Sequence, residues 1–121
     1  MARRQRRERG GLEEEILACL AASSEPMAPS EVQAALGDTL AYTTVMTTLS
    51  RMYDKRALNR EQRGRAYAYS LTDTPDVARA SMTAFNMRRL LDTQDDRAGV
   101  LAQFVGNLEP DDEQLLKELL R

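Results

Sequence analysis

Within residues 40–69 the spacing of apolar positions changes from the period of a helix to the period of a strand. In the first half, four apolar residues follow the spacing i, i+4, i+7 and i+8, which places them on one face of a helix. They are Val45, Leu49, Met52 and Tyr53. The opposite face is polar and rich in threonine, a poor helix former because branching at Cβ restricts its χ1 angle. The pattern therefore predicts a helix, and helix stability alone does not explain the threonines on its polar face.

Two explanations of this polar face are open at the level of the sequence. Threonine hydroxyls can bond to DNA base edges or phosphates, and their methyl groups can touch the thymine methyl. Alternatively, the hydroxyls of Thr44, Thr47 and Thr48 can bond back to carbonyls of their own helix. If this helix binds DNA in the major groove, its N-terminal part is expected to lie deepest in the groove. The candidates for base reading therefore come from the N-terminal part of the helix. They are Thr43, Thr44, Met46 and Thr47.

The second half of this stretch predicts two short strands around a basic turn. Residues 57–60 and 66–69 have strand character, and Gly64 between them can adopt a positive φ. Six basic and two acidic side chains lie between Arg51 and Arg65, in a chain with a net charge of −2. Such a cluster fits a grip on DNA phosphates, whereas a solvated surface hairpin is the alternative. The candidate DNA-backbone contacts are Tyr42, Arg51, Arg63, Arg65 and Tyr67.

Residues 40–69 resemble the BlaI/MecI family of bacterial winged-helix repressors, especially the forms common in actinobacteria. The resemblance rests on LAYTTVMTTL, on Arg51 and Lys55, on GRAYAY in the hairpin, and on weaker matches at both ends of the chain. It implies a homodimer that binds inverted-repeat operators in double-stranded DNA. It also implies release by proteolysis of the dimerisation region, through a sensor metalloprotease pathway. The chain has Phe85-Asn86 but no Asn-Phe pair, at which family members are often cut.

The expected fold is mainly α with a small antiparallel sheet: a winged helix-turn-helix domain plus a C-terminal helical dimerisation region. We assign residues 1–11 to a basic N-terminal tail, residues 12–72 to the DNA-binding domain and residues 73–121 to dimerisation. The tail either contacts DNA or is solvated. A first helix is expected over residues 12–22, and Met27-Ala28 as a short third strand. A second helix is expected over residues 31–36, capped by Ser30 with Gln33 as its partner.

The family usually has glycine where this chain has Arg56. A residue at this point, just after the recognition helix, often takes the left-handed conformation that glycine adopts at little cost. Arg56 must therefore either take that conformation at some cost or end the helix differently. In either case it adds a cation close to the hairpin.

The C-terminal third predicts three helices, the first capped by Thr74 with Pro75 at its first position. Gly99 in the second helix costs roughly 1 kcal/mol relative to alanine unless a close approach requires it. Short helices with several apolar stripes favour intertwining with a second copy, and packing onto the chain's own winged helix is the alternative. The candidate dimerisation residues are Val77, Phe85, Leu91, Leu101, Phe104, Val105, Leu108, Leu116, Leu119 and Leu120.

Composition excludes several other functions. The chain has one cysteine and no histidine, so we expect no disulfide, no metal site built on such residues and no cofactor. No catalytic constellation or nucleotide-binding glycine loop is visible, so an enzyme is not expected. No apolar run approaches the roughly 18 residues of a membrane span, and we expect a cytoplasmic protein. A protein-interaction module, or a DNA-binding protein without sequence preference, remains the alternative function.

Overall fold

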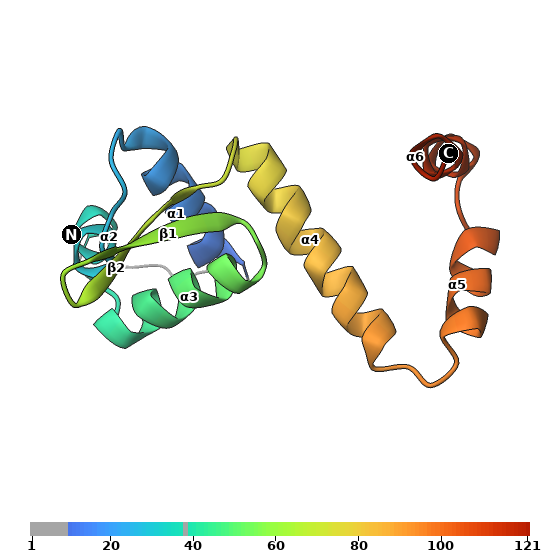
Figure 1. Ribbon diagram of the computed structural model, residues 1–121, viewed down its shortest axis with the longest axis horizontal. Coiled ribbons are helices and arrows are strands. Elements are labelled where there is room, and N and C mark those ends of the chain that lie inside the picture. Colours follow the sequence, from blue (N-terminus) through green and yellow to red (C-terminus); the bar gives the residue numbers. More distant parts are fainter. Residues whose placement is uncertain (1–9, 38) are drawn as a thin grey trace, which may run out of the picture. The chain divides into compact units, whose positions relative to one another are not determined.

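The computed structural model describes residues 10–37 and 39–121. It divides into a first unit that ends at Phe85 and a second unit, Asn86–Arg121. The elements of the first unit are α1 (Gly11–Ala22), α2 (Pro29–Ala35), α3 (Tyr42–Asp54), β1 (Leu58–Arg63), β2 (Ala66–Leu71) and the first part of α4 (Pro75–Asp92) (Figure 1). The second unit contains the end of α4, α5 (Arg97–Gly106) and α6 (Pro110–Leu119). This confirms the expected fold class. The choice between a DNA-contacting and a solvated tail concerns residues 1–9, which lie outside the described residues.

The first unit is organised around one apolar core. Helix α1 buries Ile16, Leu17 and Leu20, and the expected face of α3 buries Val45, Leu49 and Met52. The remaining core positions come from α2, the hairpin and α4: Val32, Ala57, Leu58, Tyr69, Ala78 and Met82. Because every element of the unit contributes, the core fixes the positions of α3 and the hairpin beside each other (Figure 1).

Cys19 is half-buried at the edge of this core, where its thiol lies 3.7 Å from the sulfur of Met27. Burial raises the pKa of the Cys19 thiol, which favours the neutral form. A packing role therefore accounts for this residue.

The hairpin has a regular register from Leu58↔Leu71 to Arg63↔Ala66, closed by Gly64 at φ 62° and Arg65. Met27 pairs with Tyr69 through two backbone hydrogen bonds of 2.8 Å, so the expected third strand is present as a single bridge. The hairpin is thereby tied to the segment between α1 and α2.

The start of α2 differs from the prediction. The helix begins at Pro29, and Ala28 is its N-cap, so Ser30 lies inside the first turn. The Glu31 carboxylate accepts a 2.8 Å hydrogen bond from the Ala28 N–H, and proline at the first helical position supports this earlier start. Gln33 is not a capping partner of Ser30. Its amide donates to the Leu40 carbonyl at 2.7 Å, which ties α2 to the chain entering α3.

Arg56 takes the left-handed conformation, with φ 65°. Its N–H donates to the Tyr53 carbonyl at 2.9 Å, and the N–H of Ala57 reaches back to the Met52 carbonyl at 3.0 Å. These two bonds form a Schellman motif, which satisfies carbonyls at the end of α3 and turns the chain directly into β1. Arg56 thus adopts the left-handed backbone conformation for which glycine is usually found at this position.

Side-chain caps begin α4 and α5, the first two helices of the C-terminal third. The Thr74 hydroxyl accepts a 3.2 Å hydrogen bond from the Val77 N–H, as the sequence predicts for α4. The Asp96 carboxylate caps α5 by accepting from the Gly99 N–H at 2.9 Å. A Cβ at position 99 would collide with that carboxylate, so the glycine makes room for the cap rather than for a neighbouring helix.

Candidate DNA interface

The side chains proposed to read bases lie together on the exposed side of α3. Because Val45, Leu49 and Met52 face the core, the polar face of the helix is left open to solvent. All four candidates are exposed, including the large apolar side chain of Met46 at 41%. They are Thr43, Thr44, Met46 and Thr47.

One of the threonines follows the alternative explanation. The Thr48 hydroxyl donates a 2.8 Å hydrogen bond to the carbonyl of Thr44, one turn earlier in the same helix. Thr48 is also only half-exposed, whereas Thr44 and Thr47 are exposed. Bonding back to the helix therefore accounts for Thr48, which was not among the base-reading candidates.

Some cations of the basic cluster are engaged within the first unit. Lys55 lies 3.4 Å from the Glu13 carboxylate, and this half-buried pair joins the end of α3 to α1. Arg63 donates to Glu31 at 3.1 Å and to the carbonyl of Pro26 at 2.9 Å. Arg63 therefore ties the hairpin to the start of α2, through the same carboxylate that caps that helix.

Other cations of the cluster remain open to a ligand. Within residues 10–37 and 39–121, Arg51, Arg56 and Arg65 form no ion pair, and all are exposed. Arg51 lies on α3, Arg56 at its end and Arg65 at the tip of the hairpin. The tyrosines named with the backbone candidates, Tyr42 and Tyr67, are also exposed. The structure thus separates the cations that have an acidic partner among the described residues, Lys55 and Arg63, from the exposed ones that have none.

Arg60 has a third kind of environment, which the sequence did not predict. Its guanidinium carbon lies 3.9 Å from the centre of the Tyr53 ring and 4.0 Å from that of Tyr67. Tyr53 is 36% exposed instead of joining the core as expected. Desolvation lowers the pKa of Arg60, but a hydrogen bond with Tyr69 and the neighbouring tyrosines together raise it. The alternation of strand residues could have placed Arg60 beside Tyr69, but not beside the end of α3.

The candidate dimerisation residues are mostly accessible to solvent. Val77, in the first-unit part of α4, is 44% exposed, and Phe85 is half-buried. In the second unit, all of which the structure describes, no residue is buried. Leu119 and Leu120 are 72% and 76% exposed. The second unit therefore has apolar faces but no core.

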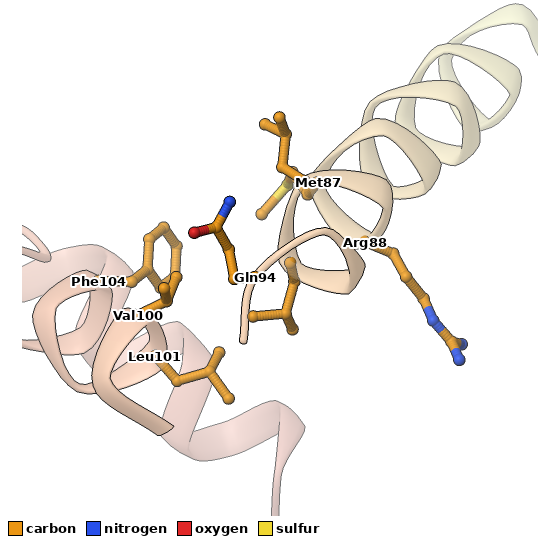
Figure 2. A pocket seen from close by; sticks show the side chains of 8 residues that line it. Met87, Arg88, Gln94, Val100, Leu101 and Phe104 are labelled. Carbon is orange, nitrogen blue, oxygen red and sulfur yellow. The ribbon is translucent and has the colours of Figure 1, made fainter. Parts of the chain in front are cut away.

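An apolar groove of about 410 Å³ lies within this second unit. Figure 2 shows Val100, Leu101 and Phe104 of α5 on one side and Met87 of α4 on the other. Only Arg88 and Gln94 add polar groups to the lining. The groove is formed by side chains that would be core residues if another apolar surface covered them.

The described residues contain neither a cluster of potential metal ligands nor a helix suited to crossing a membrane. Among residues 10–37 and 39–121, no group of three or more potential metal ligands from His, Cys, Asp and Glu comes together. Over the same residues, no helix is both long and apolar enough to cross a membrane.

An exposed polar helix beside a basic two-stranded hairpin, both fixed on a three-helix core, defines a winged-helix DNA-binding protein. The chain belongs to the penicillinase repressor family, whose model matches residues 9–121. This match confirms the resemblance to BlaI/MecI proteins. The chain is therefore a DNA-binding transcriptional repressor by family, and not an enzyme.

Solved structures of several transcription regulators are similar to the chain. The antimony-specific repressor AntR is 24% identical, with 69% of this chain and 71% of that chain covered and a TM-score of 0.48. YusO from Bacillus subtilis is 17% identical, with coverages of 89% and 69% and a TM-score of 0.48. MepR of S. aureus, in a complex with DNA, is 18% identical, with coverages of 91% and 74% and a TM-score of 0.46. No curated protein matches the chain significantly.

Proposed function

We propose that the protein is a sequence-specific repressor that acts as a homodimer on inverted-repeat operators. The observation that carries the proposal is the exposed polar face of α3 beside cations that have no acidic partner among the described residues. Base edges specify the sequence, and phosphate contacts hold the protein in register on the duplex. Exposed side chains for both kinds of contact are available on α3 and the hairpin.

In this proposal, the N-terminal half of α3 reads bases in the major groove through Thr43, Thr44, Met46 and Thr47. Arg51, Arg65, Tyr42 and Tyr67 hold the DNA backbone, and Arg56 joins them. Arg63 has a more indirect role, because a phosphate would compete with Glu31 for its guanidinium. We expect Arg63 to hold the hairpin against α2 and so to keep Arg65 in place.

The absence of a core in the second unit supports the homodimer. Exposed apolar side chains on α4, α5 and α6 are stabilised when a second copy covers them. Two copies related by a two-fold axis place two α3 helices on one face of the duplex. The half-sites of the operator would then lie about 10 base pairs apart, or a multiple of that distance.

Release of the repressor by proteolysis completes the proposal and rests on the family alone. A sensor metalloprotease pathway would trigger a cut in the C-terminal helices and so separate the DNA-binding units. The test is to follow the length of the chain in its host under inducing conditions. Disappearance of the full-length chain is expected, whereas derepression with the chain intact would contradict cleavage.

The operator is tested by selecting sheared genomic DNA with the purified protein at about 150 mM salt, where the screening length is roughly 8 Å. An inverted repeat shared by the recovered fragments is the expected result. Recovery of many unrelated fragments would instead indicate nonspecific DNA binding. Recovery of no DNA by folded protein would favour a protein-interaction module.

The base-reading face is tested with a matched pair of variants on α3. Thr44→Val removes a free hydroxyl but keeps the shape of the side chain, so the preferred sequence should change. Thr48→Val removes a hydroxyl that is bonded to the helix, so the preference should not change. An unchanged preference in Thr44→Val would show that the register assigned to α3 is wrong.

The backbone grip is tested through the dependence of affinity on salt. Arg65→Ala should weaken binding to all sequences alike and flatten the slope of log K against log salt by about one unit. Arg89→Ala removes an exposed arginine of α4 and serves as the control, with an unchanged slope. Equal slopes for Arg65→Ala and the natural chain would exclude Arg65 from the grip.

A further inference from the structure

We infer that Arg60 is a positioning residue for DNA binding: stacked between Tyr53 and Tyr67, it holds the hairpin at a set angle to α3. This inference rests on the proposed DNA contacts of the hairpin and names the device that aims them. It differs from a phosphate grip by Arg60 itself, which the charge of the residue would otherwise suggest.

The geometry brings three elements together at one point. Tyr53 belongs to the last turn of α3, Arg60 to the middle of β1 and Tyr67 to β2. The guanidinium carbon is 3.9 Å from one ring centre and 4.0 Å from the other, so a single cation contacts an aromatic ring on each of two elements. Stacking of a cation on an aromatic face is attractive and depends on orientation, which suits it to fixing an angle.

The hairpin needs such a support on the side of α3. At its far end, Arg63 ties it to Glu31 and to the Pro26 carbonyl, on the side of α2. At its near end, the chain leaves α3 through the left-handed residue Arg56. The stack lies between these points and joins α3 directly to both strands. Without it, the side chain of Arg65 is free to move relative to the bases read by α3.

The environment of Arg60 also argues against direct phosphate binding. Arg60 is half-buried, whereas Arg65 at the tip of the hairpin is exposed. A phosphate would have to compete with two aromatic rings whose centres already lie 3.9 and 4.0 Å from the guanidinium carbon. Arg65 meets no such obstacle. Arg60 therefore acts on DNA through the residues that it positions.

A double-mutant cycle between Arg60→Met and Arg65→Ala separates the two roles. Affinity is measured on one duplex, either the selected operator or, failing that, a random duplex. If Arg60 positions the hairpin, Arg65→Ala costs about tenfold in the natural chain and less than about twofold in the Arg60→Met background. If Arg60 binds phosphate itself, the two effects multiply and the salt slope falls by about one unit for each change. Multiplying effects overturn the inference.

Two further variants test whether stacking, rather than charge, accounts for the effect of Arg60→Met. Arg60→Lys keeps the charge but loses the planar group, so it should recover only part of the affinity if stacking matters, and nearly all of it if charge alone matters. Tyr53→Leu removes one ring without changing charge, and its effect should be masked in the Arg60→Met background. Arg89→Met provides the control for loss of an exposed arginine elsewhere.

A measurement without DNA distinguishes failure of this inference from failure of the proposed function. Hydrogen exchange of the amides at Glu61 and Ala68, which are paired across the two strands of the hairpin, should be at least about threefold faster in Arg60→Met, while exchange in α1 is unchanged. If that result holds but Arg65→Ala does not affect binding, the stack orders the hairpin and the proposed grip is wrong. Unchanged exchange at the hairpin would overturn the inference whatever the DNA result.

Discussion

The two units of this chain solve the problem of burying apolar surface in different ways. In the first unit, side chains from every helix and both strands of the hairpin meet in one core, and Ile16, Leu49 and Met52 are fully buried. In the second unit, all of which is described, helices of similar length carry leucine and phenylalanine but bury none of them. The first unit buries its apolar core within a single copy of the chain. The second unit has apolar side chains suited to a core, but nothing within the unit covers them.

This difference has a physical consequence for the two helices at the C-terminal end. Helices α5 and α6 have 10 residues each, and isolated helices shorter than about 12–15 residues are marginal in water. Their local bonds help only a little: exposed ion pairs such as Lys117–Glu113 contribute about 0–1 kcal/mol. We therefore expect stability of the second unit to depend on protein concentration, and stability of the first unit to be independent of it.

The largest expected effect comes from placing a charge on the open face of α5. Phe104→Asp should weaken self-association about a thousandfold, or about 4 kcal/mol, because the carboxylate would be buried without a partner. Sedimentation equilibrium measures the change. Gln103→Asp adds the same charge at an exposed polar neighbour and should leave association within about fivefold. Equal effects of the two substitutions would mean that α5 is not an interface.

A pair of leucine truncations sharpens the comparison between the units. Leu49→Ala empties a fully buried site and should lower the free energy of unfolding of the first unit by about 2–5 kcal/mol at every protein concentration. Leu119→Ala, at 72% exposure, should change stability by less than about 0.5 kcal/mol in dilute protein. Denaturant titrations at low and high concentration check this. At high concentration, a cost of Leu119→Ala that stays near zero would remove this residue from the interface.

A smaller effect is expected from the cap of α5. Asp96→Ala leaves the Gly99 N–H without its acceptor and should destabilise the helix by about 1 kcal/mol, which weakens association about fivefold. Asp95→Ala is the matched control, because Asp95 is an exposed carboxylate one residue earlier that caps nothing among the described residues. Circular dichroism and sedimentation follow helix content and association. An equal loss in both variants would assign the effect to charge rather than capping.

The smallest effect concerns the turn after α3. Arg56→Gly removes the left-handed strain of about 1–2 kcal/mol, and the greater freedom of glycine in the unfolded chain offsets about 0.5–1 kcal/mol of it. A net gain of about 0.5 kcal/mol in the first unit is expected, independent of concentration. Arg51→Gly, inside α3, should instead cost about 1 kcal/mol. Thermal unfolding compares the two, and a destabilised Arg56→Gly would mean that the arginine side chain stabilises the turn.

Local patterns in the sequence were enough to predict much of the fold. The period of Val45, Leu49 and Met52 located α3, and Gly64 located the turn of the hairpin. Thr74 began α4 as expected. The start of α2 was wrong because two capping patterns overlap there, and proline at position 29 decides between them. Local rules succeed where one pattern is present, and they fail where neighbouring patterns compete.

The sequence was less informative about the site, for a different reason. It identified a cluster of cations but not which of them have partners, because those partners are distant in the chain. Glu13 lies 42 residues from Lys55, and Glu31 lies 32 residues from Arg63. The stack on Arg60 likewise requires the end of α3 to meet the hairpin. Such contacts follow from the packed core, which a local pattern does not contain.

The most direct test of the account is hydrogen exchange of the full chain over a dilution series. We predict that amides of α5 and α6 exchange faster as the protein is diluted below its dissociation constant, while those of α1 and α3 keep their protection. Sedimentation on the same samples should follow the change from twice the chain mass of 13.6 kDa to the single chain. Protection of α5 and α6 that persists in a monomer would contradict the claim that a second copy completes the C-terminal unit.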